Sequence, residues 1–386
     1  MSWHLTDLNQ EYGFPGGVET PASYLFPAES TRHVIYLAGS GYADAQGDYH
    51  ELYCGADLVW HEKNLMSEAG APQASTPPRA YLFTDEGSQH VVYLDRTTSG
   101  HIRELYQDDG WHPNDLTDAA GAPTARLTPS GFDFVTGDTQ HVVYLGLDAH
   151  VHLLSRAHAG PDPTWTHKDL THDVGGPTSA LAPAGHAFEP GRSIHVDFVD
   201  VHGGIWEYTR DPNLNWSVAP VAAGVAPAPV TNGLHGYTFV GEGTRHIAFR
   251  TENGDVWSLS YDGDWHADNL TVDLGAAKSA AGTEPWGYVF ESAPQVPVAT
   301  EHIVYTGADS LVHEFWRDPG GWHENPLTST ASPVCGDWGP SGFADPSTSS
   351  QSVFYLSADN HVVELHYTPG PAVRPVGPVR FVRARL

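Results

Sequence analysis

The chain has 386 residues and a formal net charge of −29, from 47 acidic and 18 basic residues. A surface this acidic repels phosphate groups, which disfavours nucleic acid and anionic membranes as partners. The 40 glycines and 30 prolines argue against long helices. The longest weakly polar stretch, residues 218–230, contains three prolines and is too short to span a bilayer.

One sequence unit recurs seven times along the chain. Its tryptophans are spaced 49 to 57 residues apart, at Trp3, Trp60, Trp111, Trp165, Trp216, Trp265 and Trp322. An aligned histidine is found at His33, His90, His141, His195, His246 and His302, and Ser352 replaces it in the last copy. This period is that of a four-stranded propeller blade and is too long for ankyrin or tetratricopeptide helices.

Each unit predicts four short strands. Residues 81–83 form an aromatic first strand, and residues 142–145 are a continuous apolar run, as expected for a second strand covered on both faces. Residues 102–106 predict the third strand and residues 111–116 the fourth. Tight turns such as Asp109-Gly110 separate them, as hairpins require.

The two ends of the repeat array predict how the ring closes. Residues 3–8 begin the chain with a fourth-strand signature, whereas residues 361–367 are a third strand that no tryptophan unit follows. We therefore predict an all-β, seven-bladed β-propeller with four antiparallel strands per blade, in which the N-terminal strand completes the last blade. Closure of this kind removes open sheet edges.

The ring is expected to form one domain over residues 1–368, and residues 369–386 form a separate tail. The tail carries four of the few basic residues, namely Arg374, Arg380, Arg383 and Arg385. One interpretation is a proline-containing extension; the other is that residues 379–386 dock on an acidic surface or in the channel.

The recurring positions are the candidate ligand-binding residues, because a repeat either supports the scaffold or makes several copies of one site. The third-strand glutamates are Glu51, Glu104, Glu207, Glu314 and Glu364, with Leu153 and Ser258 in copies three and five. The second-strand aromatic residues are Tyr36, Tyr93, Tyr144, Tyr305 and Tyr355, with Phe198 and Phe249 in the other two copies. The fourth-strand candidates are Trp3, Trp60, Trp111 and Trp322.

This set is typical of carbohydrate binding in clefts between blades. Aromatic faces stack on the apolar face of a sugar, and carboxylates bond to its hydroxyl groups. Several weak sites would add up through avidity. The alternative is that the tryptophans only fill the wedge between blades and that the glutamates only bond to a neighbouring Asn or His.

The remaining chemistry-bearing residues favour structural roles. A further histidine set, His61, His112, His266 and His323, follows the tryptophans, and we interpret it as hydrogen-bonded turn residues. No metal and no cofactor is expected. Cys54 and Cys335 do not make a disulfide framework, and the sequence leaves open whether they meet. Without a secretory signal, a soluble protein synthesised in the cytoplasm is expected, and a non-classical export route stays open.

The repeat, Trp-His-x-Asn-Asp-Leu-Thr, Gly-Ala-Pro-x-Ala, Gln-His-Val-Val-Tyr-Leu and His-Ile/Val-x-Glu-Leu, resembles that of bacterial seven-bladed propeller lectins of the Photorhabdus type over residues 3–368. The resemblance implies the same fold, binding of fucose or O-methylated sugars in clefts on the ring, and homo-oligomers. The six-bladed Aleuria-type fucose lectins have comparable blades and hold fucose with an Arg, a Glu and an aromatic residue. Here Arg250 is the arginine beside the second-strand aromatic positions, and it faces the copy with Ser258, so this sequence does not assemble that triad.

Three functions follow in order of preference. The first is a multivalent, non-catalytic lectin. The second is an enzyme with one active site on the ring face or at the channel mouth, where a copy departs from the consensus. The candidate positions are Trp286 with residues 291–301, residues 39–49 and residues 335–338. The third is a protein-interaction scaffold that uses the ring face and the tail.

Overall fold

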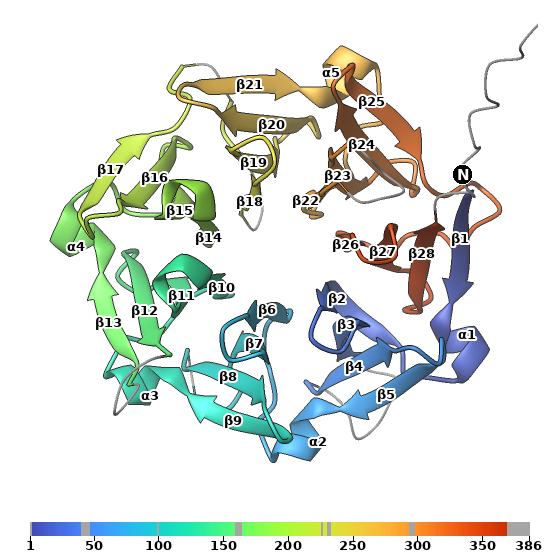
Figure 1. Cartoon of the computed structure of the whole chain (residues 1–386), viewed down its shortest axis with the longest axis horizontal. Helices are drawn as coiled ribbons and strands as arrows, with labels where there is room; N and C mark the ends of the chain where they lie inside the picture. The colour runs from blue at the N-terminus through green and yellow to red at the C-terminus, as the bar shows by residue number, and fades with distance from the viewer. Residues whose placement is uncertain are drawn as a thin grey trace, which may run out of the picture.

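In the computed structural model the chain forms a ring of seven four-stranded antiparallel sheets, as predicted (Figure 1). The structure describes residues 2–39, 47–98, 100–158, 164–224, 227–229, 233–292 and 298–368. We number the blades in chain order and name the space between two blades by their numbers, so that cleft 2/3 lies between blades 2 and 3. The predicted tail, residues 369–386, lies outside the described residues, as do parts of the predicted irregular segments (40–46 and 293–297).

In blades 1 to 6 the strands run outward from the ring axis in sequence order, whereas in blade 7 β1 lies outermost, after β26, β27 and β28 (Figure 1). Blades 1 to 3 consist of β2 (Gly17–Phe26), β3 (Thr31–Ala38), β4 (Tyr49–Cys54) and β5 (Trp60–Asn64); β6 (Arg79–Phe83), β7 (Ser88–Leu94), β8 (Ile102–Gln107) and β9 (Trp111–Asp115); and β10 (Ser130–Phe134), β11 (Thr139–Leu145), β12 (Val151–Ala157) and β13 (Thr166–Asp169). Blades 4 and 5 consist of β14 (Ala184–Phe188), β15 (Ser193–Val199), β16 (Ile205–Arg210) and β17 (Trp216–Pro220); and β18 (His235–Phe239), β19 (Thr244–Arg250), β20 (Val256–Tyr261) and β21 (Trp265–Asn269). Blades 6 and 7 consist of β22 (Trp286–Phe290), β23 (Thr300–Thr306), β24 (Val312–Asp318) and β25 (Gly321–Pro326); and β26 (Ser341–Asp345), β27 (Ser350–Leu356), β28 (Val362–Thr368) and β1 (Ser2–Asp7).

The innermost strands approach their neighbours closely because a glycine faces an aromatic ring of the preceding blade. A Cβ atom on Gly131 would lie 2.3 Å from the Tyr81 ring, and one on Gly287 would lie 2.1 Å from Tyr237. Gly185, Gly236 and Gly342 make the same approach in three further blades. A side chain at these positions would therefore push adjacent blades apart.

Short helices that the sequence pattern did not reveal follow five of the fourth strands, on the outer rim (Figure 1). They are α1 (Leu8–Tyr12), α2 (Leu65–Ala69), α3 (Leu116–Ala120), α4 (Leu170–Val174) and α5 (Leu270–Leu274); two 3₁₀ turns, η1 (Val135–Gly137) and η2 (Glu189–Gly191), also occur. Five residues are too few to show a helical period.

The Asp-Leu-Thr part of the repeat builds these helices. In blade 2 the Asp115 carboxylate caps α3 by accepting from the Asp118 backbone N–H. Leu116 is fully buried, and the Thr117 hydroxyl oxygen accepts from the Ile102 backbone N–H at 2.8 Å. The motif thereby ties each fourth strand to the third strand beside it.

The predicted closure of the ring is confirmed. β1 pairs with β28 in antiparallel register from Ser2↔Thr368 to Asp7↔Val363. The Asp7 carboxylate lies 2.8 Å from His361 Nδ1, and the Val362 backbone N–H donates to Asn9. Leu8 then packs with Val34 of blade 1, so the closing segment joins the last blade to the first.

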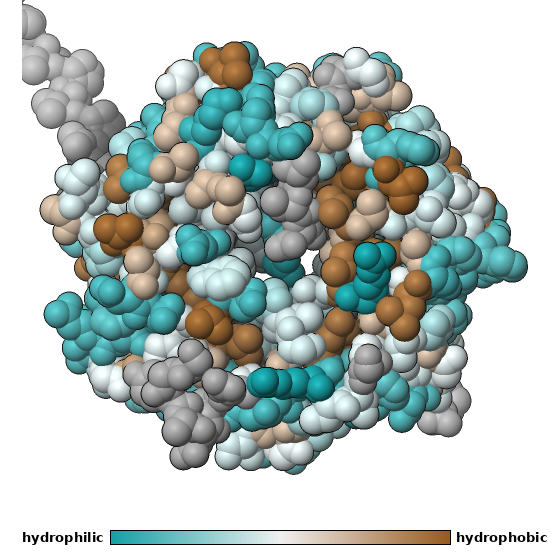
Figure 2. Space-filling view, turned by 180° about the vertical axis from the view of Figure 1, so that it is seen from behind, coloured by the Kyte–Doolittle hydropathy of each residue, from teal (hydrophilic) through white to brown (hydrophobic). Residues whose placement is uncertain are grey.

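Figure 2 shows one face of the ring, on which hydrophilic side chains cover much of the surface and apolar side chains lie between them. Across the axis, Arg79, the first residue of β6 in blade 2, pairs with Glu284 before blade 6 at 2.9 Å. Cys54 and Cys335 are buried free thiols and are not joined. Burial raises the pKa of Cys335 to about 12, which makes that thiol unreactive. In the described part of the chain no helix has the length and apolar character needed to cross a membrane.

The closing segment contains a matched pair of leucines that tests its contribution. Leu8→Ala should lower the free energy of unfolding by about 2–5 kcal/mol because Leu8 is fully buried between blades 7 and 1. Leu5→Ala, at a leucine of β1 that is 39% exposed, should change it by less than about 0.5 kcal/mol. Urea unfolding followed by tryptophan fluorescence measures both, and equal effects would contradict the role of this segment as the closure.

Candidate functional site

The five predicted tyrosines of the second strands lie inside the ring. Each is fully buried, as are Phe198 and Phe249 at the same position. Each hydroxyl donates to a backbone carbonyl of the loop before the blade, for example Tyr144 to Pro123 at 3.0 Å and Tyr36 to Pro15 at 2.9 Å. Tyr93, Tyr305 and Tyr355 bond in the same way. Their role as ligand contacts stays a prediction, and these contacts show what they do for the scaffold.

The third-strand glutamates are 2–6% exposed and accept hydrogen bonds from the recurring histidine, or its replacement Ser352, on the second strand. In blade 2, Glu104 Oε1 lies 2.8 Å from His90 Nδ1, and His90 Nε2 lies 2.7 Å from the Ser88 hydroxyl. Glu51, Glu207 and Glu314 pair with His33, His195 and His302; Glu364 accepts from Ser352. First-strand tyrosines add donors, as Tyr81 does to Glu104 at 3.1 Å.

A hydroxyl group, an imidazole and a carboxylate joined by hydrogen bonds in this order also form the catalytic triad of serine hydrolases. Here, however, the hydroxyl–imidazole contact recurs in six blades, and its hydroxyl belongs to threonine in four of them (Thr31, Thr139, Thr244 and Thr300). A nucleophile would not be expected to occur in six buried copies. We therefore assign these contacts to the scaffold.

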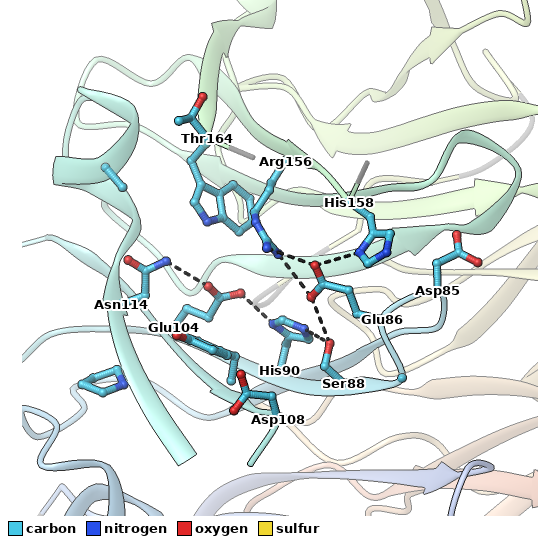
Figure 3. A pocket seen from close by; sticks show the side chains of 15 residues that line it. Asp85, Glu86, Ser88, His90, Glu104, Asp108, Asn114, Arg156, His158 and Thr164 are labelled. Atoms are coloured by element: carbon cyan, nitrogen blue, oxygen red, sulfur yellow. Dashed lines mark hydrogen bonds and ion pairs between the residues drawn. The ribbon is translucent and has the colours of Figure 1, made fainter. Parts of the chain in front are cut away.

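Cleft 2/3 is a hollow between two blades with a volume of about 820 Å³ (Figure 3). Blade 2 contributes Glu104, Tyr106 and Asn114 to its walls, and blade 3 contributes Arg156 and Trp165. The Asn114 amide donates to Glu104 Oε2 at 3.2 Å. The cleft therefore combines aromatic surface with a carboxylate, an amide and a guanidinium group, drawn from two blades.

At the mouth of cleft 2/3, the Glu86 carboxylate contacts both basic side chains, Arg156 and His158. Arg156 Nη2 and His158 Nδ1 each lie 3.0 Å from Glu86 Oε1, as the dashed lines in Figure 3 show. Burial acts to raise the pKa of Glu86, but its hydrogen bonds with His158 and Arg156 lower it below the ordinary value. The same contact raises the pKa of His158. Arg156 is thereby held in place by an ionised carboxylate.

Two more clefts lie at equivalent places on the ring. Cleft 6/7 has a volume of about 360 Å³ and is lined by Glu314 and Trp316 of blade 6 and by Trp3 and Tyr367 of blade 7. Cleft 5/6 has a volume of about 170 Å³, with Trp322 in its wall. Of the predicted residues, the structure thus brings Glu104, Glu314, Trp3 and Trp322 into open clefts.

Two other interfaces are filled by the protein's own arginines, which the sequence reasoning missed. In cleft 4/5, Arg245 lies 3.1 Å from Glu207 and stacks over Trp265, with 5.1 Å between the guanidinium carbon and the ring centroid. In cleft 7/1, Arg32 lies 3.7 Å from Glu364 and stacks over Trp60 at 5.5 Å. Arg245 and Arg32 each immediately precede the recurring histidine of the second strand.

In the two filled clefts, the pKa of the glutamate depends on how close the arginine lies to it. Burial acts to raise the pKa of Glu207, but His195 and Arg245 bring it below the ordinary value. At Glu364, burial outweighs the more distant Arg32, and the pKa is raised. A ligand would have to displace an internal guanidinium from either cleft.

The copies without a third-strand glutamate are compensated differently. In cleft 3/4, Leu153 replaces the carboxylate with an apolar side chain that packs in the core between the two blades. In cleft 5/6, Glu301 of blade 6 makes the contact with the recurring histidine that the glutamate replaced by Ser258 would make. Glu301 lies 2.9 Å from His246 and 2.6 Å from Arg317, and Tyr237 donates to it at 2.6 Å. The signal in the sequence is a Glu directly before His302, where copies two, three and seven have Gln89, Gln140 and Gln351.

The turn histidines have the predicted kind of partner. His61, His112, His266 and His323 each contact an aspartate of the preceding turn, namely Asp57, Asp109, Asp262 and Asp318. Among the described residues, three groups of His and Asp side chains have their nitrogen and oxygen atoms within 4.8 Å of one another, close enough to hold a cation. They are His101 with Asp115 and Asp118, Asp108 with Asp109 and His112, and Asp148 with His152 and Asp169.

Trp286 and the channel were the alternative positions for a single active site. Trp286 Nε1 donates to the Gly342 carbonyl at 2.9 Å, and its ring packs on His235 with 4.0 Å between centroids. The hollow at the channel mouth measures about 190 Å³ and contains the Arg79–Glu284 pair. These contacts join neighbouring blades and bridge the axis.

Glu301 makes stability depend on pH. Burial acts to raise its pKa, but hydrogen bonds with His246 and the charge of Arg317 lower the pKa to about 2. Because the folded-state pKa is below the unfolded one, ionised Glu301 stabilises the fold above about pH 4.5, and this contribution is lost as the pH falls towards 2. Glu301→Gln should cost about 1.5–3 kcal/mol at pH 7 and clearly less at pH 3.

Glu242→Gln is the matched control, since Glu242 pairs with the same Arg317 but its side chain is 42% exposed. Its effect should stay below about 1 kcal/mol. Urea unfolding of both variants at the two pH values is the measurement; a cost for Glu301→Gln that does not change with pH would contradict the assignment.

No protein-family model and no curated protein matches this chain. Solved structures do. The lectin BP39L from Burkholderia pseudomallei is 11% identical, with a TM-score of 0.62 over 92% of this chain and 96% of that one. AofleA from Arthrobotrys oligospora is 12% identical, with a TM-score of 0.54 and 92% of each chain covered. A mutant of the Aleuria aurantia lectin, in complex with Fucalpha1-6GlcNAc, is 15% identical, with a TM-score of 0.51 over 76% of this chain and 92% of that one. At these identities the likeness shows the fold: this chain shares the propeller architecture of these lectins.

Proposed function

We propose that this chain is a carbohydrate-binding protein whose sites are the open clefts between adjacent blades. The observation that carries the proposal is cleft 2/3, where Trp165 and Tyr106 provide aromatic surface and Glu104, Asn114 and Arg156 provide polar groups. A sugar ring needs one apolar support and several directed hydrogen bonds. This cleft offers both, in a volume of about 820 Å³.

Fucosides are the first ligands to examine. The Aleuria aurantia lectin mutant is described in two complexes with fucose-containing ligands, Fucalpha1-6GlcNAc and alpha-methyl-L-fucoside. The sequence resemblance adds O-methylated sugars. The sequence alone did not assemble the arginine, glutamate and aromatic residue of the Aleuria-type sites. We infer that Arg156, Glu104 and Trp165, which line cleft 2/3 from two blades, would be their counterparts.

The number of sites is smaller than the number of blades. Clefts 2/3, 5/6 and 6/7 are open, whereas internal arginines fill clefts 4/5 and 7/1. A protein with two or three weak sites still gains from avidity on a surface that displays many copies of a glycan. We propose multivalent binding of this limited kind.

Arg156 tests the site directly. Arg156→Ala should weaken binding of a fucoside or O-methylated sugar roughly tenfold, because a charge-assisted hydrogen bond to a hydroxyl is lost. Arg210→Ala is the matched control: Arg210 lies at the same strand position in blade 4 but faces cleft 3/4, where Leu153 replaces the glutamate. Calorimetry measures both affinities. A glycan array without any binding to the unmodified chain would reject the proposal.

The filled clefts offer a gain-of-function test. Arg245→Gln should raise the number of sugar molecules bound per chain by one, because it uncovers Glu207 and Trp265. Glutamine is compatible with this position, since Gln89, Gln140 and Gln351 occupy it in blades 2, 3 and 7. Arg32→Gln should have the same effect in cleft 7/1. A stoichiometry that stays constant in correctly folded variants would show that these clefts are not latent sites.

A further inference from the structure

Cleft 6/7 contains a buried carboxylate between aromatic walls. Glu314 is 3% exposed, and its Oε1 lies 2.8 Å from His302 Nδ1. The rings of Trp3 and Tyr367 meet at 5.4 Å on the blade 7 side, and Trp316 stands on the blade 6 side. Figure 3 shows the equivalent cleft 2/3, where Arg156 lies between the two blades.

The equivalent clefts show which group this environment accepts. In cleft 7/1 the Arg32 guanidinium lies between Glu364 and the Trp60 ring. In cleft 4/5 the Arg245 guanidinium lies between Glu207 and two rings, 4.0 Å from the centroid of Tyr261 and 5.1 Å from that of Trp265. Two interfaces thus use one solution, a cation held by a carboxylate and stacked on aromatic faces.

Cleft 6/7 has the same carboxylate and tryptophan, and each position that supplies a cation elsewhere is neutral. Gln351 occupies the place of Arg32 and Arg245, and Tyr367 occupies the place of Arg156 and Arg317. Asn325 stands opposite Glu314, where Lys63 stands opposite Glu51 in blade 1. Among the described residues that line this cleft, none is a lysine or arginine.

We propose that cleft 6/7 binds a guanidinium or primary ammonium group of a small ligand, in the place that internal arginines fill in clefts 4/5 and 7/1. The ligand cation would pair with Glu314 and stack on Trp3 or Trp316. The chain's net charge of −29 adds a long-range attraction that salt weakens. This activity goes beyond sugar binding, and its test uses no fucoside.

Methylguanidinium chloride is the probe, with uncharged methylurea as its isostere and sodium chloride at matched ionic strength. Binding is followed through the indole N–H signals of Trp3 and Trp316 in NMR spectra, assigned with Trp3→Phe and Trp316→Phe. Methylguanidinium should shift these signals saturably, and methylurea should bind roughly tenfold or more weakly. Equal shifts from the two compounds would overturn the proposal.

Glu314→Gln should abolish the preference for the charged probe, because Gln retains the shape of the side chain but not its charge. Glu104→Gln is the matched control, at the same position of blade 2 but in cleft 2/3, and should leave the signals of Trp3 and Trp316 responsive. Gln351→Arg should fill the cleft as Arg245 fills its own and prevent binding. Probe binding that survives both Glu314→Gln and Gln351→Arg would also overturn the proposal.

Two arms identify the source of the cation. Glucosamine that binds where glucose does not would point to an amino sugar, and methylguanidinium without glucosamine would point to an arginine-like ligand. A chain with Arg374, Arg380, Arg383 and Arg385 replaced by glutamine is titrated in parallel, so that competition by these residues is visible as tighter probe binding. Binding by either chain supports the proposal, and binding by neither refutes it.

Discussion

A carboxylate nearly removed from water stands in most of the interfaces between blades, and the way each interface neutralises it determines what that interface can do. Desolvating an unpaired carboxylate is costly, so hydrogen-bond donors or cations must accompany it. The imidazole or hydroxyl of the second strand and the tyrosine of the first strand supply part of that need. The remaining part is met by an arginine in clefts 4/5 and 7/1, where the interface is closed.

Clefts 2/3 and 5/6 are open because the arginine that pairs with a carboxylate there lies at a different strand position. In cleft 2/3 the arginine belongs to the third strand of the next blade and is held at the mouth by Glu86, so space remains beside Glu104. In cleft 5/6 the carboxylate has moved to Glu301, which holds Arg317 on one side. Substitutions at three strand positions thus make the interfaces of one repeat different from one another. These are the residue before the recurring histidine, the third-strand glutamate, and the third-strand position that Arg156 and Tyr367 share.

The sequence allowed the fold to be predicted well, because tryptophan and histidine spacing, strand lengths and the unmatched strands at the two ends all agree with one ring. The site was harder to predict, since each cleft combines residues from two blades, and their pairing depends on the register of adjacent strands. Arg250 stood beside the aromatic position in the sequence, yet it lies at the other end of β19 from the cleft and donates towards the Ser279 carbonyl. Arg245, five residues earlier, reaches Glu207 instead.

The pairing of β1 with β28 has a consequence for how the chain folds. β1 is synthesised about 360 residues before β28, the strand with which it pairs. Until β28 has been synthesised, β1 has no strand with which to pair, and the ring cannot close. The ring therefore closes in a single late step. A chain truncated before the hairpin of β27 and β28 would retain most of its sheets, but β1 would be left as an unpaired edge strand with which other nascent chains can pair.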